Sequence, residues 1–320
     1  ITFACSGDIP LTSTLVINAS MTLDGSGQSV TLDGGGHVSV LFIDSPVQFT
    51  LKALTVANGN TGSSGGGIHN NGGTVTISNS TIANNTGFTS AGGIFNQGGT
   101  VTISNSTIAN NTAILDVGGG IQNQGGTVTI SNSTIANNQA GDYHNGGGIW
   151  NDGTMTISNS TIANNTAVNG AGIAHDSGTM TISNSTIANN TDKDGAGIWS
   201  NSGMSIGASI LAGNGGGNCF GSVNDLGYNL ESNTDCSFTA STDQQNTTPQ
   251  FQGGLQSNGG PTQTLALQPT SPAVNKVPVK SCTTGGTDQR GQPRPDRILL
   301  LFPESACDIG AYEVQDGLLT

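Results

Sequence analysis

An internal repeat constrains the fold of this chain more than any other feature. The phrase TVTISNSTIANN begins at Thr74, Thr100 and Thr127, and it returns as TMTISNSTIANN at Thr154 and Thr179. Successive copies lie 25 to 27 residues apart. A fixed period of this length indicates a solenoid, in which each repeat forms one unit that stacks on its neighbours.

Each repeat contains three short segments in which apolar and polar residues alternate. In the first regular copy these segments are 67–70, 74–78 and 80–84. Alternation with period two indicates strands, and each segment is too short for a helix. Three strands and three bends per repeat predict an all-β fold, a right-handed parallel β-helix with one coil in each period of roughly 26 residues.

A single coil cannot be stable alone. It offers roughly five inward aliphatic side chains that each contribute about 1.5–3 kcal/mol, whereas ordering each residue costs about 1.5 kcal/mol. Coils stacked about 4.8 Å apart pair their backbones and share one core. Alternation directs Val75, Ile77 and Ile82 inward, and it predicts that the asparagine closing the third strand forms a buried amide ladder. The predicted ladder is Asn84, Asn110, Asn137, Asn164 and Asn189.

The repeat also predicts the domain organisation. Residues 1–48 form divergent N-terminal coils and residues 49–214 form the regular repeats. Residues 215–320 form the last coil or coils and a capping segment, which is expected to cover the apolar end of the stack.

Composition excludes several partners. The chain has 50 glycines, 8% charged residues and a formal net charge of −13, with 7 Lys and Arg in total. Without a basic stripe, binding to nucleic acid is disfavoured. The sequence contains no run of 18 apolar residues, so it predicts no membrane-spanning helix. The sequence opens at Ile1 without an apolar leader, so we expect a processed product or a fragment.

Four of the five cysteines lie in the C-terminal third, at Cys219, Cys236, Cys282 and Cys307. They lack the CxxC spacing of a zinc site, so the sequence favours two local disulfides, Cys219–Cys236 and Cys282–Cys307. Cys5 is left over, as a buried thiol or as a link to another chain.

The C-terminal third carries segments that point to a family. LGYNL (226–230), NGGPTQT (258–264), TDQRG (287–291) and DIGAYE (308–313) follow one another there. The succession resembles the C-terminal region of bacterial choice-of-anchor Q domain proteins. The resemblance implies a β-helix that is secreted or held at the cell surface, and it implies no reaction.

A polysaccharide-active enzyme is an alternative on this fold. A glycosidase needs two carboxyl groups that face one cleft, and the bends before the GGI motifs supply Asp116, Asp142, Asp192 and Asp194. Asp116 and Asp142 occupy related places in adjacent coils. Asp192 and Asp194 also offer oxygen ligands to calcium, although no calcium motif surrounds them. A lyase is disfavoured, because Lys193 is the only basic residue between Lys52 and Lys276.

Two outward surfaces are candidates for binding. Phe95, Trp150 and Trp199 follow an inward isoleucine and form a sparse aromatic stripe, with His69 and Gln122 in the same register. The second surface is a Thr-x-Thr grid that resembles the ice-binding faces of β-solenoid antifreeze proteins, although threonine also simply suits exposed strands. The grid comprises Thr74, Thr76, Thr100, Thr102, Thr127, Thr129, Thr154, Thr156, Thr179 and Thr181.

The sequence therefore favours a non-catalytic structural or adhesive protein without a cofactor. Its expected location is outside the cell or on the cell surface, and its expected partners are other copies of the chain, a surface or a polysaccharide. End-to-end stacking into filaments is one version of this role. The alternatives are a polysaccharide-active enzyme and an ice-binding protein.

Overall fold

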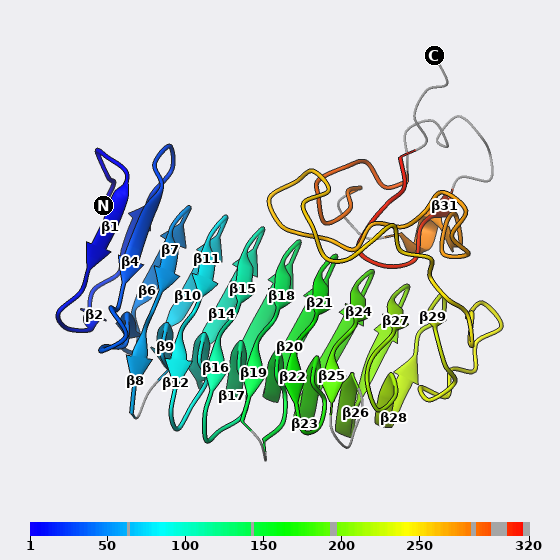
Figure 1. Cartoon of the computed structure of the whole chain (residues 1–320), viewed down its shortest axis with the longest axis horizontal. Coiled ribbons are helices and arrows are strands. Elements are labelled where there is room, and N and C mark those ends of the chain that lie inside the picture. Colours follow the sequence, from blue (N-terminus) through cyan, green and yellow to red (C-terminus); the bar gives the residue numbers. More distant parts are fainter. Residues whose placement is uncertain (63–64, 142–143, 193–196, 283–285, 296–305, 316–320) are drawn as a thin grey trace.

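The chain winds into a stack of parallel β coils (Figure 1), the predicted all-β solenoid. The part of the chain described by the computed structural model contains no α-helix, and its single 3-10 helix is η1 (Val279–Ser281). Each coil contributes one rung to each side of the stack. The described residues are 1–62, 65–141, 144–192, 197–282, 286–295 and 306–315.

The broadest side of the stack is a 13-stranded sheet, here called sheet 1. The first two predicted segments of each repeat both lie on this side. They form separate strands in the early coils and a single strand from β17 onward. Its strands are β2 (Leu15–Ile17), β3 (Met21–Asp24), β5 (Leu41–Ile43), β6 (Gln48–Lys52), β9 (Ile68–Asn71), β10 (Thr74–Ser78), β13 (Ile94–Gln97), β14 (Thr100–Ser104), β17 (Ile121–Ser131), β20 (Ile149–Ser158), β23 (Ile173–Ser183), β26 (Ile198–Gly207) and β28 (Cys219–Asp225).

The third predicted segment forms the second side, a 10-stranded sheet called sheet 2. An asparagine turn with positive φ separates it from sheet 1, as at Asn79 with a φ of 50°. Its strands are β1 (Gly7–Pro10), β4 (Val30–Asp33), β7 (Thr55–Ala57), β11 (Thr81–Ala83), β15 (Thr107–Ala109), β18 (Thr134–Ala136), β21 (Thr161–Ala163), β24 (Thr186–Ala188), β27 (Ile210–Ala212) and β29 (Leu230–Glu231).

The third side is a narrow 6-stranded sheet of two-residue strands, called sheet 3, which the alternation pattern did not reveal. A run this short carries no readable period. Its strands are β8 (Asn60–Thr61), β12 (Thr86–Gly87), β16 (Thr112–Ala113), β19 (Gln139–Ala140), β22 (Thr166–Ala167) and β25 (Thr191–Asp192).

Identical side chains stack inside the tube because the repeated TVTIS and TIA segments pair residue for residue. Ile77 pairs with Ile103, which pairs with Ile130, and all three side chains are completely buried. Ile82 and Ile108 form an equivalent pair under sheet 2. One continuous hydrophobic cluster therefore runs through the coils, as the stacking energetics require.

The amide ladder exists, but it is built one residue later than predicted. Asn84 has a φ of 58° and an exposed side chain, whereas Asn85 is completely buried. The side-chain amide of Asn85 donates to Oδ1 of Asn111 at 3.0 Å, and Asn111 donates to Asn138 in the same way. The left-handed residue interrupts the alternation, so the residue after it points inward. The predicted set, Asn84, Asn110, Asn137, Asn164 and Asn189, instead forms the outer corner, with φ between 56° and 58°.

A second ladder lies inside sheet 1, at the bend between its two segments. Asn70 donates to Asn96 at 2.8 Å, and Asn96 donates to Asn123 at 2.8 Å. Asn123 continues to Asn151, whose amide lies 3.1 Å from Nδ1 of His175. Each of these asparagines lies two positions after a buried isoleucine, so alternation along the strand directs it inward. This spacing is the feature of the sequence that could have revealed the second ladder.

The C-terminal end of the stack is closed. Residues 232–247, here called the end cap, follow the last strand of sheet 2. The predicted disulfide Cys219–Cys236 ties them to β28, and Phe238 packs into the core cluster. Gln244 pairs with the edge of β29 through a bridge to Leu230. The end cap therefore satisfies backbone groups that an open edge would expose.

The remaining C-terminal residues fold back along sheet 2 (Figure 1). We call residues 249–282, 286–295 and 306–315 the lateral segment. The second predicted disulfide, Cys282–Cys307, and the two-stranded pair β30 (Val277–Pro278) and β31 (Ala306–Cys307) tie it together. It covers the outer face of sheet 2 from β18 to β27, leaving the earlier strands uncovered.

Two buried pairs of an arginine and an acidic side chain lie within the lateral segment. Arg290 pairs with Asp288 at 2.7 Å, and Arg294 pairs with Glu313 at 3.0 Å. Arg294 also donates to Oδ1 of Asn159 at 3.2 Å, which links the segment to the coils.

Candidate functional site

The aromatic stripe belongs to a continuous outward column on sheet 1. Strand pairing places Phe95 between His69 and Gln122, Trp150 after Gln122, and Trp199 two rungs after Trp150. The column extends beyond the stripe that the sequence predicted, since Phe42 precedes it and Phe220 follows it. We call the full set the aromatic column: Phe42, His69, Phe95, Gln122, Trp150, Ala174, Trp199 and Phe220.

The rings of the aromatic column differ in exposure. Phe95 is 9% exposed, Trp150 and Trp199 are half-buried, and Phe220 is 60% exposed. The glycine-rich bends that lead into sheet 1 pass directly beside the rings. A Cβ added at Gly65 would lie 3.0 Å from the Cβ of Phe95, and one added at Gly146 would lie 3.0 Å from the Cβ of Trp150. These bends therefore form one wall of the column, and glycine permits their close approach.

The first three side chains of the column are rings in contact with one another. The ring centroid of His69 lies 5.0 Å from that of Phe42, edge to face, and 4.9 Å from that of Phe95. Burial lowers the pKa of His69, while the contact with Gln97, 3.3 Å from Nε2 to Oε1, opposes that shift. The imidazole is therefore neutral at pH 7 and acts as part of an aromatic surface.

A column of polar side chains runs beside the rings, two residues further along each strand, or three in β23, where the pairing is irregular. We call Asn71, Gln97, Gln124, Asp152 and Ser177 the polar column, and strand pairing places them on consecutive rungs. Gln97, Gln124 and Ser177 are exposed, and the Ser177 hydroxyl donates to the Asp152 carboxylate. Rings beside amides and hydroxyls can pack against an apolar surface and bond polar groups at the same time.

The threonine grid lies on the same sheet, beyond the polar column. Thr74 pairs with Thr100 and Thr76 pairs with Thr102, and the register continues without a shift through Thr181. All but Thr76, which is half-buried, are exposed. The two rows of hydroxyls are thus regular, as the repeat predicted.

The candidate catalytic carboxylates are only partly described. Asp116 is half-buried, caps its own bend by accepting the N–H of Val117 at 2.8 Å, and contacts the amide of Gln122 at 3.4 Å. Asp142 and Asp194 lie outside the described residues, as does the side chain of Asp192. The structure thus gives no test of a catalytic pair or of a calcium site at these positions.

Two negative findings concern the described residues alone. They hold no group of three or more His, Cys, Asp or Glu side chains arranged to bind a metal ion. They also include no helix with the length and apolar character needed to cross a membrane.

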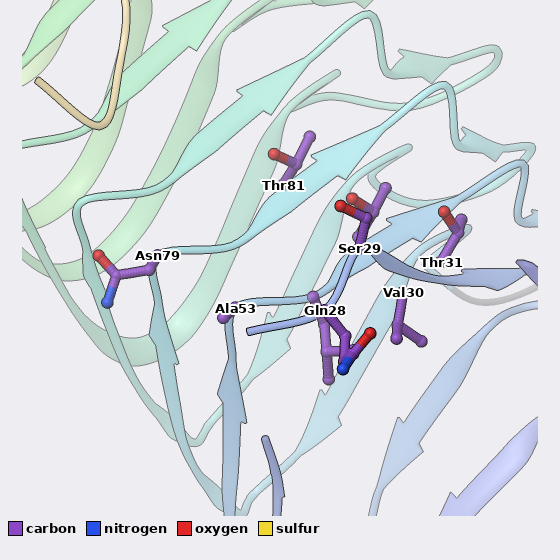
Figure 2. Close-up of a pocket in the computed structure, with 9 residues that line it drawn as sticks. Gln28, Ser29, Val30, Thr31, Ala53, Asn79 and Thr81 are labelled. Carbon is purple, nitrogen blue, oxygen red and sulfur yellow. The ribbon is translucent and has the colours of Figure 1, made fainter. Parts of the chain in front are cut away.

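A separate hollow of about 290 Å³ lies over the uncovered part of sheet 2 (Figure 2). Outward Thr31, Thr55 and Thr81 line its floor, and Asn79 lies at its edge. Ala53 occupies the turn position where the next coil has Asn79, so a side chain is missing there. Among the described residues, none with a titratable side chain lines this hollow. It therefore offers fewer groups for ligand binding than the aromatic column and the polar column do.

Comparison with known proteins supports the fold and no narrower family. No family model matches the chain, and no curated protein matches it. The resemblance of the C-terminal segments to choice-of-anchor Q domain proteins is therefore not shown by these comparisons. A crystal structure of the pectate lyase Pel9A matches 96% of this chain and 86% of that chain, with 14% identity and a TM-score of 0.53. At this identity the likeness concerns the fold alone, and the chain has a pectate lyase-like parallel β-helix fold.

Proposed function

We propose that this protein is an adhesive β-helix that binds polysaccharide through the outer face of sheet 1. One observation carries the proposal: the aromatic column and the polar column lie side by side on five consecutive rungs, from β9 to β23. Aromatic rings pack against the C–H faces of sugars, while amides and hydroxyls bond sugar hydroxyl groups.

An extracellular or surface location fits two features of the chain. Both disulfides lie in the segments that close and cover the stack. Such bonds persist in oxidising compartments. The similarity to a pectate lyase fold is consistent with this location and with a polysaccharide partner.

A polysaccharide-active enzyme is the alternative that the fold permits. The fold by itself does not show catalysis, since one scaffold supports unrelated functions. An adhesin retains polysaccharide without cutting it, so the two functions separate in a single experiment. The purified chain is incubated with insoluble plant, fungal and bacterial polysaccharides, and both the bound protein and the newly formed reducing ends are measured.

We expect retention of the protein without new reducing ends. The double variant Trp150→Ala/Trp199→Ala should lose most of the retention, while the control Thr102→Ala, on the threonine grid, should keep it. New reducing ends would support the enzyme, and equal retention of both variants would remove the aromatic column from the proposal.

The threonine grid supports a second function, ice binding. Its two exposed rows repeat at about 4.8 Å between rungs and about 7 Å along the strand, which gives a flat, regular array of hydroxyl and methyl groups. Thermal hysteresis measured on the wild type and on Thr129→Lys tests this function. A freezing point without hysteresis in the wild type would rule it out.

Filament formation is the weakest part of the structural role. A head-to-tail contact needs two open ends, and the end cap covers one of them. The opposite end keeps apolar side chains that are only partly buried, including Phe3, Leu15 and Met21. Negative-stain microscopy of concentrated protein distinguishes single rods from filaments.

A further inference from the structure

Four of the five large rings of the aromatic column lie on every second rung, and among these four Phe42, Trp150 and Trp199 are half-buried while Phe95 is 9% exposed. Smaller or polar residues occupy the rungs between them. The four rings are Phe42, Phe95, Trp150 and Trp199, and the intervening residues are His69, Gln122 and Ala174. Since rungs are about 4.8 Å apart, successive large rings are roughly 9.6 Å apart along the axis of the stack.

This spacing matches one class of polymer. In an extended β-1,4-linked glycan, each pyranose ring is turned by about half a turn relative to the previous one. One sugar with its linkage is about as long as one rung. The same C–H face therefore returns every second sugar, at the interval of the large rings. A chain running along the stack axis would meet the half-buried rings of Trp150 and Trp199 with equivalent faces.

The charges on sheet 1 select among such polymers. Asp152 and Asp176 lie beside the column and accept hydrogen bonds from Ser177 and Asn201. Among the described strands of sheet 1, Lys52 is the only Lys or Arg, and it pairs with Asp24 at 3.0 Å. A polyuronate would meet carboxylates without a compensating cation. Amides and hydroxyls suit an uncharged sugar.

We propose that the aromatic column binds one neutral, extended β-1,4-linked glycan along the stack axis, with one large ring for every two sugars. This inference rests on the proposed polysaccharide-binding function, and it adds the ligand class and the register. Phe220 lies one rung after Trp199 and is therefore out of that register, although it is the most exposed ring of the column.

The register is tested by chain length. Isothermal titration of the wild type is carried out with cello-, manno- and xylo-oligosaccharides of increasing length, and with oligogalacturonates of equal length. At least one neutral series should gain affinity in steps, about 3- to 10-fold for each added pair of sugars once the chain reaches another ring. Odd additions should add little, and the oligogalacturonates should bind more weakly.

Three variants locate the contact. With the longest neutral ligand, Trp150→Ala should lower the affinity about 3- to 10-fold. Phe220→Ala and the same-strand control Thr156→Ala should change it less than about 2-fold. Circular dichroism and thermal melting establish that each variant is folded, and Trp150→Phe, which retains a ring, should restore most of the affinity.

Each outcome bears on a different statement. An equal gain for every added sugar, or an equal loss in Phe220→Ala and Trp150→Ala, would overturn the two-rung register. Tighter binding of oligogalacturonates would overturn the ligand class while the polysaccharide-binding function stands. If the insoluble polysaccharides also fail to retain the wild type, the proposed function itself is wrong.

Discussion

The two halves of sheet 2 carry nearly the same repeat and have different surroundings. Thr81 and Thr107 face outward on the uncovered half and are half-buried, with the hollow of Figure 2 around Thr81. Thr134 and Thr161 occupy the equivalent rungs of the covered half and are buried. The repeat therefore builds the wall, and a segment outside the repeat decides which part of the wall meets solvent.

One side chain shows how the covered half is held. Gln289 is completely buried between the lateral segment and sheet 2. Its amide donates to the Thr134 hydroxyl at 2.9 Å and to the Thr262 hydroxyl at 2.9 Å, while its Oε1 accepts from Thr161 at 2.6 Å. On the uncovered half the threonine hydroxyls are partly exposed to solvent. On the covered half the equivalent hydroxyls form hydrogen bonds with the lateral segment.

The difference between the covered and the uncovered half of sheet 2 should respond most strongly to removal of the Glu313 carboxyl group. Glu313→Ala leaves the guanidinium of Arg294 buried without its acidic partner, which typically costs about 3–5 kcal/mol. We expect the lateral segment to detach, seen as faster proteolysis of residues 249–315 and a lower free energy of unfolding. The matched control is Lys52→Met, which breaks the more exposed pair with Asp24 and should leave proteolysis and the unfolding free energy nearly unchanged, because solvent screens that pair. Equal proteolysis of the two variants would contradict the role of the buried pair.

The stability of the covered half should also depend on pH, because Glu313 titrates there, with a smaller effect than removal of its carboxyl group. Burial raises the pKa of Glu313 to about 8 from its ordinary value of 4.5, while Arg294 opposes the rise. The folded state then holds a proton that the unfolded state releases. The stability of the covered half is therefore full below about pH 4.5 and falls as the pH rises through 8, by at most about 5 kcal/mol. Glu313→Gln should flatten the unfolding free energy measured between pH 4.5 and 8, and an unchanged slope in that variant would assign the dependence to another group.

The smallest expected effect compares two threonines directly. Thr134→Val removes the hydroxyl that donates to the carbonyl of Gln263 at 2.6 Å and accepts from Gln289, so it should cost about 1–3 kcal/mol. Thr81→Val, at the equivalent position of the uncovered half, should change stability by less than about 0.5 kcal/mol. Urea denaturation of both variants gives the difference. Equal changes in unfolding free energy would show that the lateral segment and the solvent provide equally good hydrogen bonds to the threonine hydroxyl.

The local pattern predicted much of the fold and part of the candidate site. Alternation placed Ile77 inside and Thr76 outside, and it aligned Phe95, Trp150 and Trp199 on one face, because residue-for-residue pairing within these segments converts sequence position into spatial position. The same pattern failed at Asn84. A single left-handed residue there shifts the alternation, so the ladder forms at Asn85. The sequence did not show that Phe42 and Phe220 extend the column, since their coils diverge from the repeat.

The sequence by itself determined the coil, its period, the outward rows of side chains and the pairing of the four C-terminal cysteines. The coil, its period and the outward rows follow from contacts within one repeat or between neighbouring copies, which a period makes readable, whereas the cysteine pairing follows from closeness in the sequence. Only the tertiary structure decided where the lateral segment lies, which threonines it covers and which acid meets Arg294. The contacts between the lateral segment and sheet 2 join residues more than 100 positions apart, such as Arg294 and Asn159, and Glu313 lies 19 positions from Arg294 in a part of the chain that has no repeat. No local periodicity encodes them.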